Sequence, residues 1–232
     1  MSNAMVNFLV HDMRLQLRNG IYYAYAFVLA FYISVLVFAT EYIPSWALAL
    51  FIYTDPSVLG FFFLGALMLL EKAEGSRTAL AITPLSVHVY FWSKTITLTC
   101  VALVVAVTLA LVAKTNINWP LYVSAIILTS ISFIGFGFPI ALKFKTVTGY
   151  LIGAAGILTP LTLPMFFALF DPMGYWAMLI PPAAQFRLFL VSLGTFEASG
   201  LELFTMLLVS ALSAVALVIF ATKALKKEFG RQ

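Results

Sequence analysis

The residues whose types and spacing could support a chemical function lie together in one internal stretch, residues 71–86. Here a charged segment leads into a glycine, which predicts the end of one helix, and a threonine before a proline then predicts the cap and first turn of the next. A short apolar element between two such ends suits docking into a groove on a partner protein, although an ordinary solvated loop fits these residues equally well. The candidate residues are Glu71, Glu74, Gly75, Arg77, Thr83 and Pro84.

Other constellations that could do chemistry are weak. His11 and His88 lie far apart and lack the ligand spacing of a metal site, so we expect no metal and no catalytic residue in this chain. A Gly-x-x-x-x-Gly-Lys-Ser/Thr phosphate loop does not occur either, so any ATP chemistry must belong to another subunit. The basic residues are scattered, so no nucleic-acid partner is expected.

The elements that must position the candidate stretch are membrane helices. Hydrophobic residues make up 63% of the chain and charged residues 9%, whereas an ordinary soluble domain is about 25% charged. A chain this apolar cannot cover a water-facing exterior, so lipid must be its solvent. We therefore predict an all-α polytopic integral membrane protein.

Six apolar segments are long enough to cross a bilayer as helices, which takes about 20 residues each. The second is the least certain, because Asp55-Pro56 resembles a helix cap while Trp46–Tyr53, just before it, is too short to span. That short segment either packs at the outer surface or joins the helix through a kink. The predicted spans are Ile21–Thr40, Pro56–Leu70, Ser93–Ala113, Trp119–Leu142, Val147–Phe170 and Leu201–Thr222.

The distribution of basic residues predicts the orientation. With both termini in the cytoplasm, all of the 13 Lys and Arg except Lys114 and Arg187 fall on the cytoplasmic side, as the positive-inside rule requires. This arrangement places residues 71–86 in the cytoplasm. It also places every acidic residue at a span end or in a loop, with Asp55 on the outer side, so no proton carrier is expected at the membrane midplane.

Two further segments are predicted around the spans. Residues 5–20 have apolar side chains at helical spacing and polar ones, including Asp12, Arg14 and Arg18, on the other, solvent-facing side. This pattern indicates an amphipathic interfacial helix, although an extension of the first span is possible. Asn19-Gly20 predicts a break between this helix and the first span. Residues 1–4 look like residues added for expression and are left out of this reading, so the membrane domain is expected to cover 21–232. Met173–Gly194 is interrupted by Pro181-Pro182, which predicts a re-entrant region before the last span.

The residues around the candidate stretch resemble a signature of type-2 ABC transporter permeases. The resemblance rests on Leu69-Leu70-Glu71-Lys72, Glu74-Gly75, Leu80 and Thr83-Pro84-Leu85-Ser86. Asp55-Pro56-Ser57 with Leu59-Gly60, and Lys94, resemble the fluoroquinolone-export branch of that family. The chain departs from the pattern after the glycine, where Ser76-Arg77 replaces the common Thr-Leu, and this puts the individual ATPase contacts in question.

The resemblance implies a permease subunit of an ABC exporter in the plasma membrane. Two such subunits, identical or related, would form a dimer and dock on separate ATPase subunits that bind ATP and Mg. The six candidate residues, with Arg14 and Arg18 of the N-terminal helix, would couple ATP hydrolysis to transport. Each could instead be structural: Gly75 a helix terminator, Thr83 a cap, Arg77 a topology charge.

The exported compound is expected to be hydrophobic or amphipathic, either drug-like or lipid-like. Two alternatives from other classes stay open: an ATPase-independent secondary transporter and a non-transporting membrane assembly protein.

Overall fold

The computed structural model of this chain describes residues 2–39, 43–55, 58, 60–75, 86–113 and 116–230. Over these residues the chain forms helices and the turns between them, without a β-strand. The all-α prediction is therefore confirmed. The helices are α1 (Ser2–Arg18), α2 (Ile21–Ala39), α3 (Ser45–Thr54), α4 (Gly60–Ala73), α6 (Val87–Ala113), α7 (Trp119–Ala141), α8 (Val147–Thr162), the 3-10 helix η2 (Leu163–Leu169), α9 (Tyr175–Met178), α10 (Pro181–Ser192) and α11 (Gly200–Phe229).

Five helical segments of the described chain are long and apolar enough to cross a membrane. They match five of the six predicted spans. The segments are Ile21–Phe38, Val87–Ala113, Trp119–Ala141, Val147–Leu169 and Gly200–Phe229.

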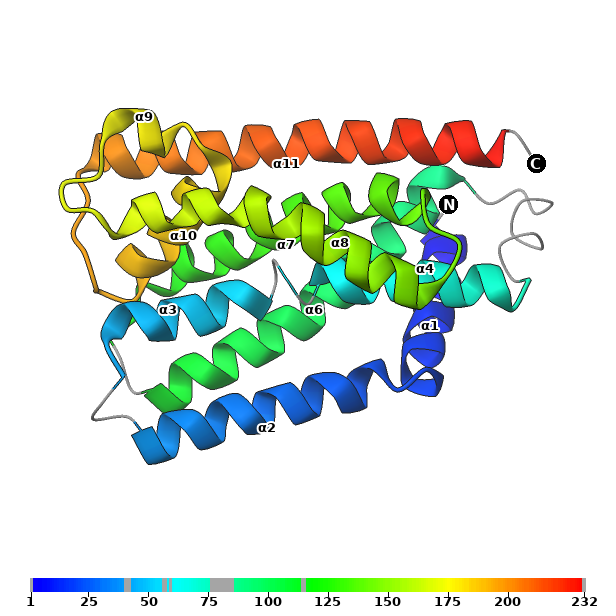
Figure 1. Cartoon of the computed structure of the whole chain (residues 1–232), viewed down its shortest axis with the longest axis horizontal. Coiled ribbons are helices and arrows are strands. Elements are labelled where there is room, and N and C mark those ends of the chain that lie inside the picture. Colours follow the sequence, from blue (N-terminus) through cyan, green and yellow to red (C-terminus); the bar gives the residue numbers. More distant parts are fainter. Residues whose placement is uncertain are drawn as a thin grey trace.

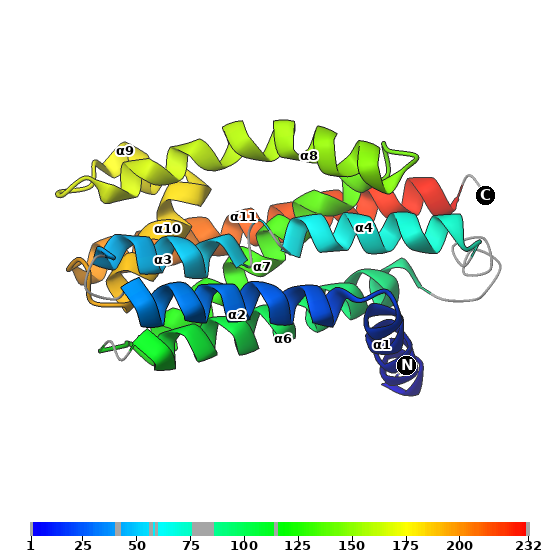
Figure 2. The ribbon, with the colours of Figure 1, turned by 60° about the horizontal axis from the view of Figure 1, so that its bottom comes forward.

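The second predicted span, Pro56–Leu70, differs from the structure. In its place α3 and α4 follow one another end to end along the bundle (Figures 1 and 2), and α4, with 14 residues, is too short to span alone. Of the two possibilities for Trp46–Tyr53, the structure favours a helix joined to the next through a break. Pro56 itself lies outside the described residues.

Asp55 is not the outer-side helix cap that the sequence predicted. It continues α3 as its C-cap residue in right-handed helical conformation, while α4 begins only at Gly60. The junction between the two helices lies midway along the bundle (Figures 1 and 2), and Asp55 is 0% exposed. The Asp-Pro pattern resembles a cap, but its position in the fold depends on where the chain enters the bundle, which the local pattern does not encode.

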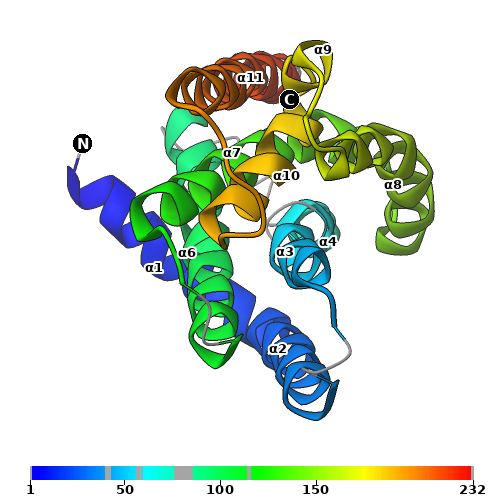
Figure 3. The same cartoon turned by 90° about the vertical axis from the view of Figure 1, so that its left-hand side faces the viewer.

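The helix at the centre of the bundle is α7, which packs against α4, α6, α10 and α11. Its start is set locally, because the Asn118 side chain accepts a hydrogen bond from the Leu121 amide and Pro120 occupies the first turn. A Ser199–Glu202 capping box starts α11 in the same way. Figure 3 shows α8 at the edge of the bundle, α11 along one side and α2 on the opposite side.

The N-terminal helix α1 crosses the end of the bundle at a steep angle to α2 (Figures 1 and 2). The chain turns at Asn19-Gly20, where the sequence predicted a break, and Gly20 has a φ of 76°. This left-handed backbone conformation favours glycine because it has no Cβ.

Before α11 the chain folds back in short helices. The double proline starts α10 at its first turn, and most of α10 is buried. This helix packs against α3, α7, α11 and η2. A straight span through this region is absent from the described chain, as the two prolines predicted.

Candidate functional site

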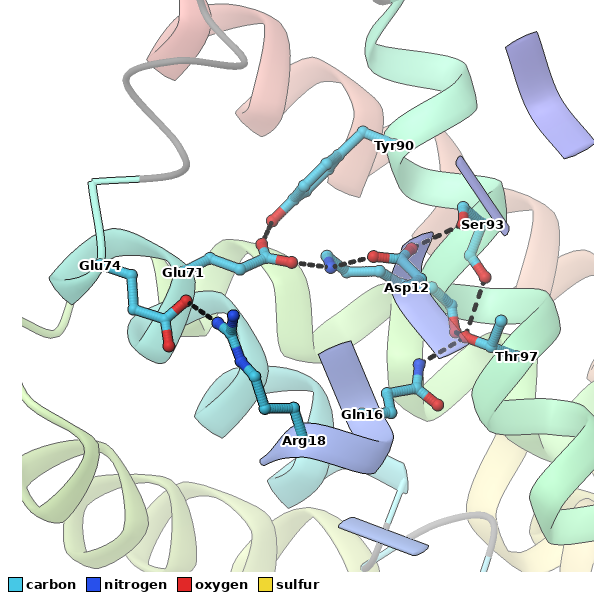
Figure 4. Close-up of polar contacts among 9 residues, drawn as sticks. Asp12, Gln16, Arg18, Glu71, Glu74, Tyr90, Ser93 and Thr97 are labelled. Atoms are coloured by element: carbon cyan, nitrogen blue, oxygen red, sulfur yellow. Dashed lines mark hydrogen bonds and ion pairs between the residues drawn. The ribbon is translucent and has the colours of Figure 1, made fainter. Parts of the chain in front are cut away.

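A buried group of charged side chains lies where α1, the end of α4 and the start of α6 meet (Figure 4). Lys94 of α6 is 0% exposed. Its ammonium group donates a hydrogen bond to Asp12 Oδ1 of α1 at 3.0 Å and forms an ion pair with Glu71 of α4. Residues 12, 71 and 94, far apart in the sequence, thus meet at one point.

Hydroxyl groups of α6 satisfy the remaining oxygens of the two carboxylates. Tyr90 donates from its hydroxyl to Glu71 Oε2 at 2.8 Å, and Ser93 donates to Asp12 Oδ2 at 2.6 Å. One turn further along α1, the Gln16 amide donates to Thr97 Oγ1 at 2.7 Å. We call Asp12, Gln16, Glu71, Tyr90, Ser93, Lys94 and Thr97 the α1–α4–α6 cluster.

Tyr90 also connects the cluster to the rest of the bundle. Its ring packs edge-on against Phe138 of α7 and Phe229 of α11 and tilts against Phe8 of α1 at 6.1 Å between ring centroids. Aromatic contacts of this kind stabilise by about 0.5–1.5 kcal/mol beyond the area they bury. Tyr90 thus contacts α1, α4, α7 and α11 from the start of α6.

The buried charges of the cluster compensate one another. Two buried carboxylates share one ammonium group, and burying such charges is costly unless they pair and hydrogen-bond, as they do here. Such a cluster holds its helices in one register, because separating them leaves unpaired charges in an apolar environment. It ties together the two ends that flank residues 76–85, since Glu71 precedes that stretch and Tyr90 and Lys94 follow it.

The helix α1 has a buried face in addition to the apolar and polar sides that the sequence predicted. The predicted apolar stripe, including Val6, Val10 and Met13, is exposed on the surface of the chain. Phe8, Asp12 and Leu15, on the opposite side, are buried against the bundle. The sequence reading assigned Asp12 to the solvent side, because the bundle-facing side of a membrane-surface helix is not apparent from periodicity alone.

The predicted site residues that the structure describes fall into different environments. Glu71 lies inside the bundle, 2% exposed, and not on a surface that a partner could touch. Glu74 pairs with Arg18 of α1 at 2.6 Å, and their side chains are 36% and 65% exposed. Gly75 has a φ of 73°, which supports its reading as a helix terminator.

Arg14 is exposed on α1. Arg77, Thr83 and Pro84 lie outside the described residues.

Sequence reasoning missed Asp12, Tyr90, Ser93 and the central position of Lys94. One signal was available, since a lysine inside an apolar helical segment demands a buried partner or a route to water. The identity of that partner depended on the packing of α1.

A cavity of about 320 Å³ lies between α7, α8, η2, α10 and α11. Its wall is apolar except for a few side chains; one of these, Gln185, donates its amide to Ser132 Oγ at 3.0 Å. Pockets of this size and character suit small apolar ligands with one or two polar groups. The lining residues are Ser132, Phe133, Phe136, Pro160, Leu161, Pro164, Ile180, Pro181, Pro182, Gln185, Ser213 and Leu217.

Comparisons with known proteins agree with the sequence resemblance. Two proteins named fluoroquinolones export permease, from two strains of Mycobacterium tuberculosis, are each 26% identical to this chain over 172 residues. The alignment covers 73% of this chain and 69% of each relative. No solved structure matches the chain. One protein-family model matches residues 3–229, which is almost the whole length of this chain. This chain is a membrane transport protein that belongs to the fluoroquinolones export permease protein family.

Proposed function

We propose that this chain is the membrane subunit of an ATP-driven exporter for hydrophobic or amphipathic compounds. Two copies, or this chain and a related permease, would form the pathway in the plasma membrane, and a separate ABC ATPase would bind ATP and Mg. Family membership supports export, and the names of the relatives favour a drug of the fluoroquinolone class. The cavity between α7 and α10 is of a size and polarity that such a compound could occupy.

The proposal includes six crossings with both termini in the cytoplasm. It counts α3 and α4 together as the second crossing, which their end-to-end arrangement supports (Figure 2). The N-terminal helix α1 would lie in the inner interface, with Val6, Val10 and Met13 toward lipid. The short helices before α11 would form a re-entrant region, supported by their burial against other helices.

The observation that carries the coupling mechanism is the α1–α4–α6 cluster. Residues 71–86 would contact the ATPase, with Glu74, Gly75, Arg77, Thr83 and Pro84 as candidates, while buried Glu71 would relay movement and not touch the partner. Arg14 and exposed Arg18 of α1 would complete the contact surface. Because the cluster joins both flanks of residues 76–85 to α1, a shift of that stretch would move α1, α4 and α6 together. The pathway would then alternate between inward and outward openings.

The test is co-expression with an ABC ATPase, co-purification, and transport of a fluorescent fluoroquinolone into liposomes. We expect nucleotide-dependent transport, and expect Arg77→Glu to reduce ATPase co-purification at least tenfold. The matched control is Lys145→Glu, an exposed lysine between α7 and α8, which should leave co-purification intact. Transport that persists without the ATPase under a proton gradient would overturn the ATP-driven function and favour a secondary transporter. Absence of any transport with a bound, active ATPase would favour an assembly role.

A further inference from the structure

One buried carboxyl group, that of Asp55 at the C-terminal end of α3, lacks a partner among the residues that the structure describes. Asp55 is 0% exposed, and neither of its side-chain oxygens forms a hydrogen bond with a described residue. This residue differs from the carboxylates of the α1–α4–α6 cluster, whose oxygens are paired with an ammonium group and hydroxyls. Its place at the α3–α4 junction lies far along the bundle from that cluster (Figure 2).

The described parts of α2, α3 and α7 offer Asp55 phenol groups and no positive charge. Tyr25 and Tyr32 of α2 and Tyr122 of α7 lie close enough to interact electrostatically with the carboxyl group. Tyr53, two residues earlier in α3, is also a phenol. The described parts of α2, α3 and α7 contain no lysine, arginine or histidine.

The basic side chains of the other neighbouring helices are either bound to other groups or exposed. Arg187 of α10, the helix that packs on α3, binds the Asp171 carboxylate at 3.0 Å and the carbonyl oxygen of Ala168 at 2.9 Å. Lys94 of α6 is bound by Asp12 and Glu71. His88 and Lys72, the remaining basic residues of the described α4 and α6, are exposed near the end of the bundle where the α1–α4–α6 cluster lies.

An ionised carboxylate without a partner is very unfavourable in such an apolar interior, whereas a protonated carboxyl group is neutral. The Tyr25 hydroxyl of α2 is also buried, with no hydrogen-bond partner among the residues that the structure describes.

We propose that Asp55 is a proton-binding site inside the membrane domain. The carboxyl group holds a proton in the conformation described here. When water reaches this carboxyl group, the O–H bond breaks, the proton passes to water and the carboxylate is hydrated. Transport through this protein is therefore sensitive to pH on the side from which water reaches Asp55, whichever energy source drives it.

The experiment is infrared spectroscopy of the purified chain in lipid nanodiscs, without ATPase or drug, at neutral pH. A protonated carboxyl group absorbs in a region separate from carboxylates, and its band shifts in heavy water. We expect wild type to show such a band and Asp55→Asn to lose it, while Glu197→Gln, which removes an exposed carboxylate near the start of α11, keeps it. Asp55→Glu should retain the band at a shifted frequency, and it replaces Asp55→Asn if that variant does not fold.

The proposal is wrong if the folded Asp55→Asn protein keeps the whole protonated-carboxyl band of wild type, or if Asp55→Glu leaves the band unmoved. Because the measurement needs neither ATP nor substrate, its result is separate from the test of ATP-driven export. The two tests together distinguish a protein that binds the proton but lacks ATP-driven transport from one that has ATP-driven transport but does not bind the proton.

Discussion

Lys94 lies where three helices meet, with its ammonium group between Asp12 of α1 and Glu71 of α4. Both carboxylates are buried, so neither can gain water when its partner is lost. Arg18 and Glu74 form a second ion pair nearby, and their side chains are 65% and 36% exposed. The two ion pairs therefore differ in burial more than in geometry, and this difference predicts how much each contributes to the free energy of unfolding.

Replacing Lys94 by methionine should destabilise the protein by about 3–5 kcal/mol, because it leaves two buried carboxylates without a counter-charge. The measurement is the free energy of unfolding in mixed detergent micelles. Adding Glu71→Gln to Lys94→Met should recover part of the loss by removing one of those charges. Arg18→Met is the matched control, since an exposed pair contributes about 0–1 kcal/mol. Equal losses from Lys94→Met and Arg18→Met would contradict the structural weight given to the buried cluster.

Packing between the helices depends in part on the close approach of α4 and α8. A Cβ at Gly65 of α4 would lie 2.0 Å from the Tyr150 ring of α8. The Tyr150 hydroxyl donates to the carbonyl oxygen of Phe61 at 2.8 Å, so the ring is held in place. Gly135 and Gly137 allow similar approaches of α7 to α11 and α4. These small residues let backbones pack tightly without a hydrophobic driving force from water.

Substituting Gly65 by alanine should therefore cost about 1–3 kcal/mol, as overpacking in a well-filled interior does. Gly156→Ala, on α8 with open space at its Cβ position, should be neutral or slightly stabilising, because alanine is the better helix former. Thermal unfolding of both variants in one detergent measures the difference. A Gly65→Ala protein as stable as Gly156→Ala would show that Tyr150 is free to move aside.

The whole molecule brings its N-terminal helix and the end of α11 to the same end of the bundle (Figure 1). The α1–α4–α6 cluster lies at this end, as does the turn between α7 and α8 that carries Lys143 and Lys145. The turn between α10 and α11 lies at the opposite end. This arrangement agrees with an even number of crossings, and the basic residues favour the cytoplasm for the first end.

Reporter fusions test that orientation. Green fluorescent protein fused after Gln232 should fluoresce, and alkaline phosphatase fused there should be inactive, because the cytoplasm allows the first to fold and keeps the second inactive. Alkaline phosphatase fused after Phe196, between α10 and α11, should be active. Phosphatase activity at Gln232 would reverse the topology and would also remove residues 71–86 from the side of the membrane where ATP is found.

The sequence by itself determined the membrane class, the family and the break at Asn19-Gly20. It also placed five of the spans within a few residues, except at the start of α6 and the end of α11. These follow from composition, run length, turn residues and a local motif, all of which act over short stretches of chain. Only the tertiary structure decided that residues 12, 71 and 94 form one cluster, because their pairing depends on how α1 crosses the bundle. It also placed Asp55 in a buried position at the C-terminal end of α3, where the sequence predicted the start of a helix on the outer side. Asp55 and its proline resemble a cap wherever they occur, and only the helices packed around the residue bury it away from water and from every described basic side chain.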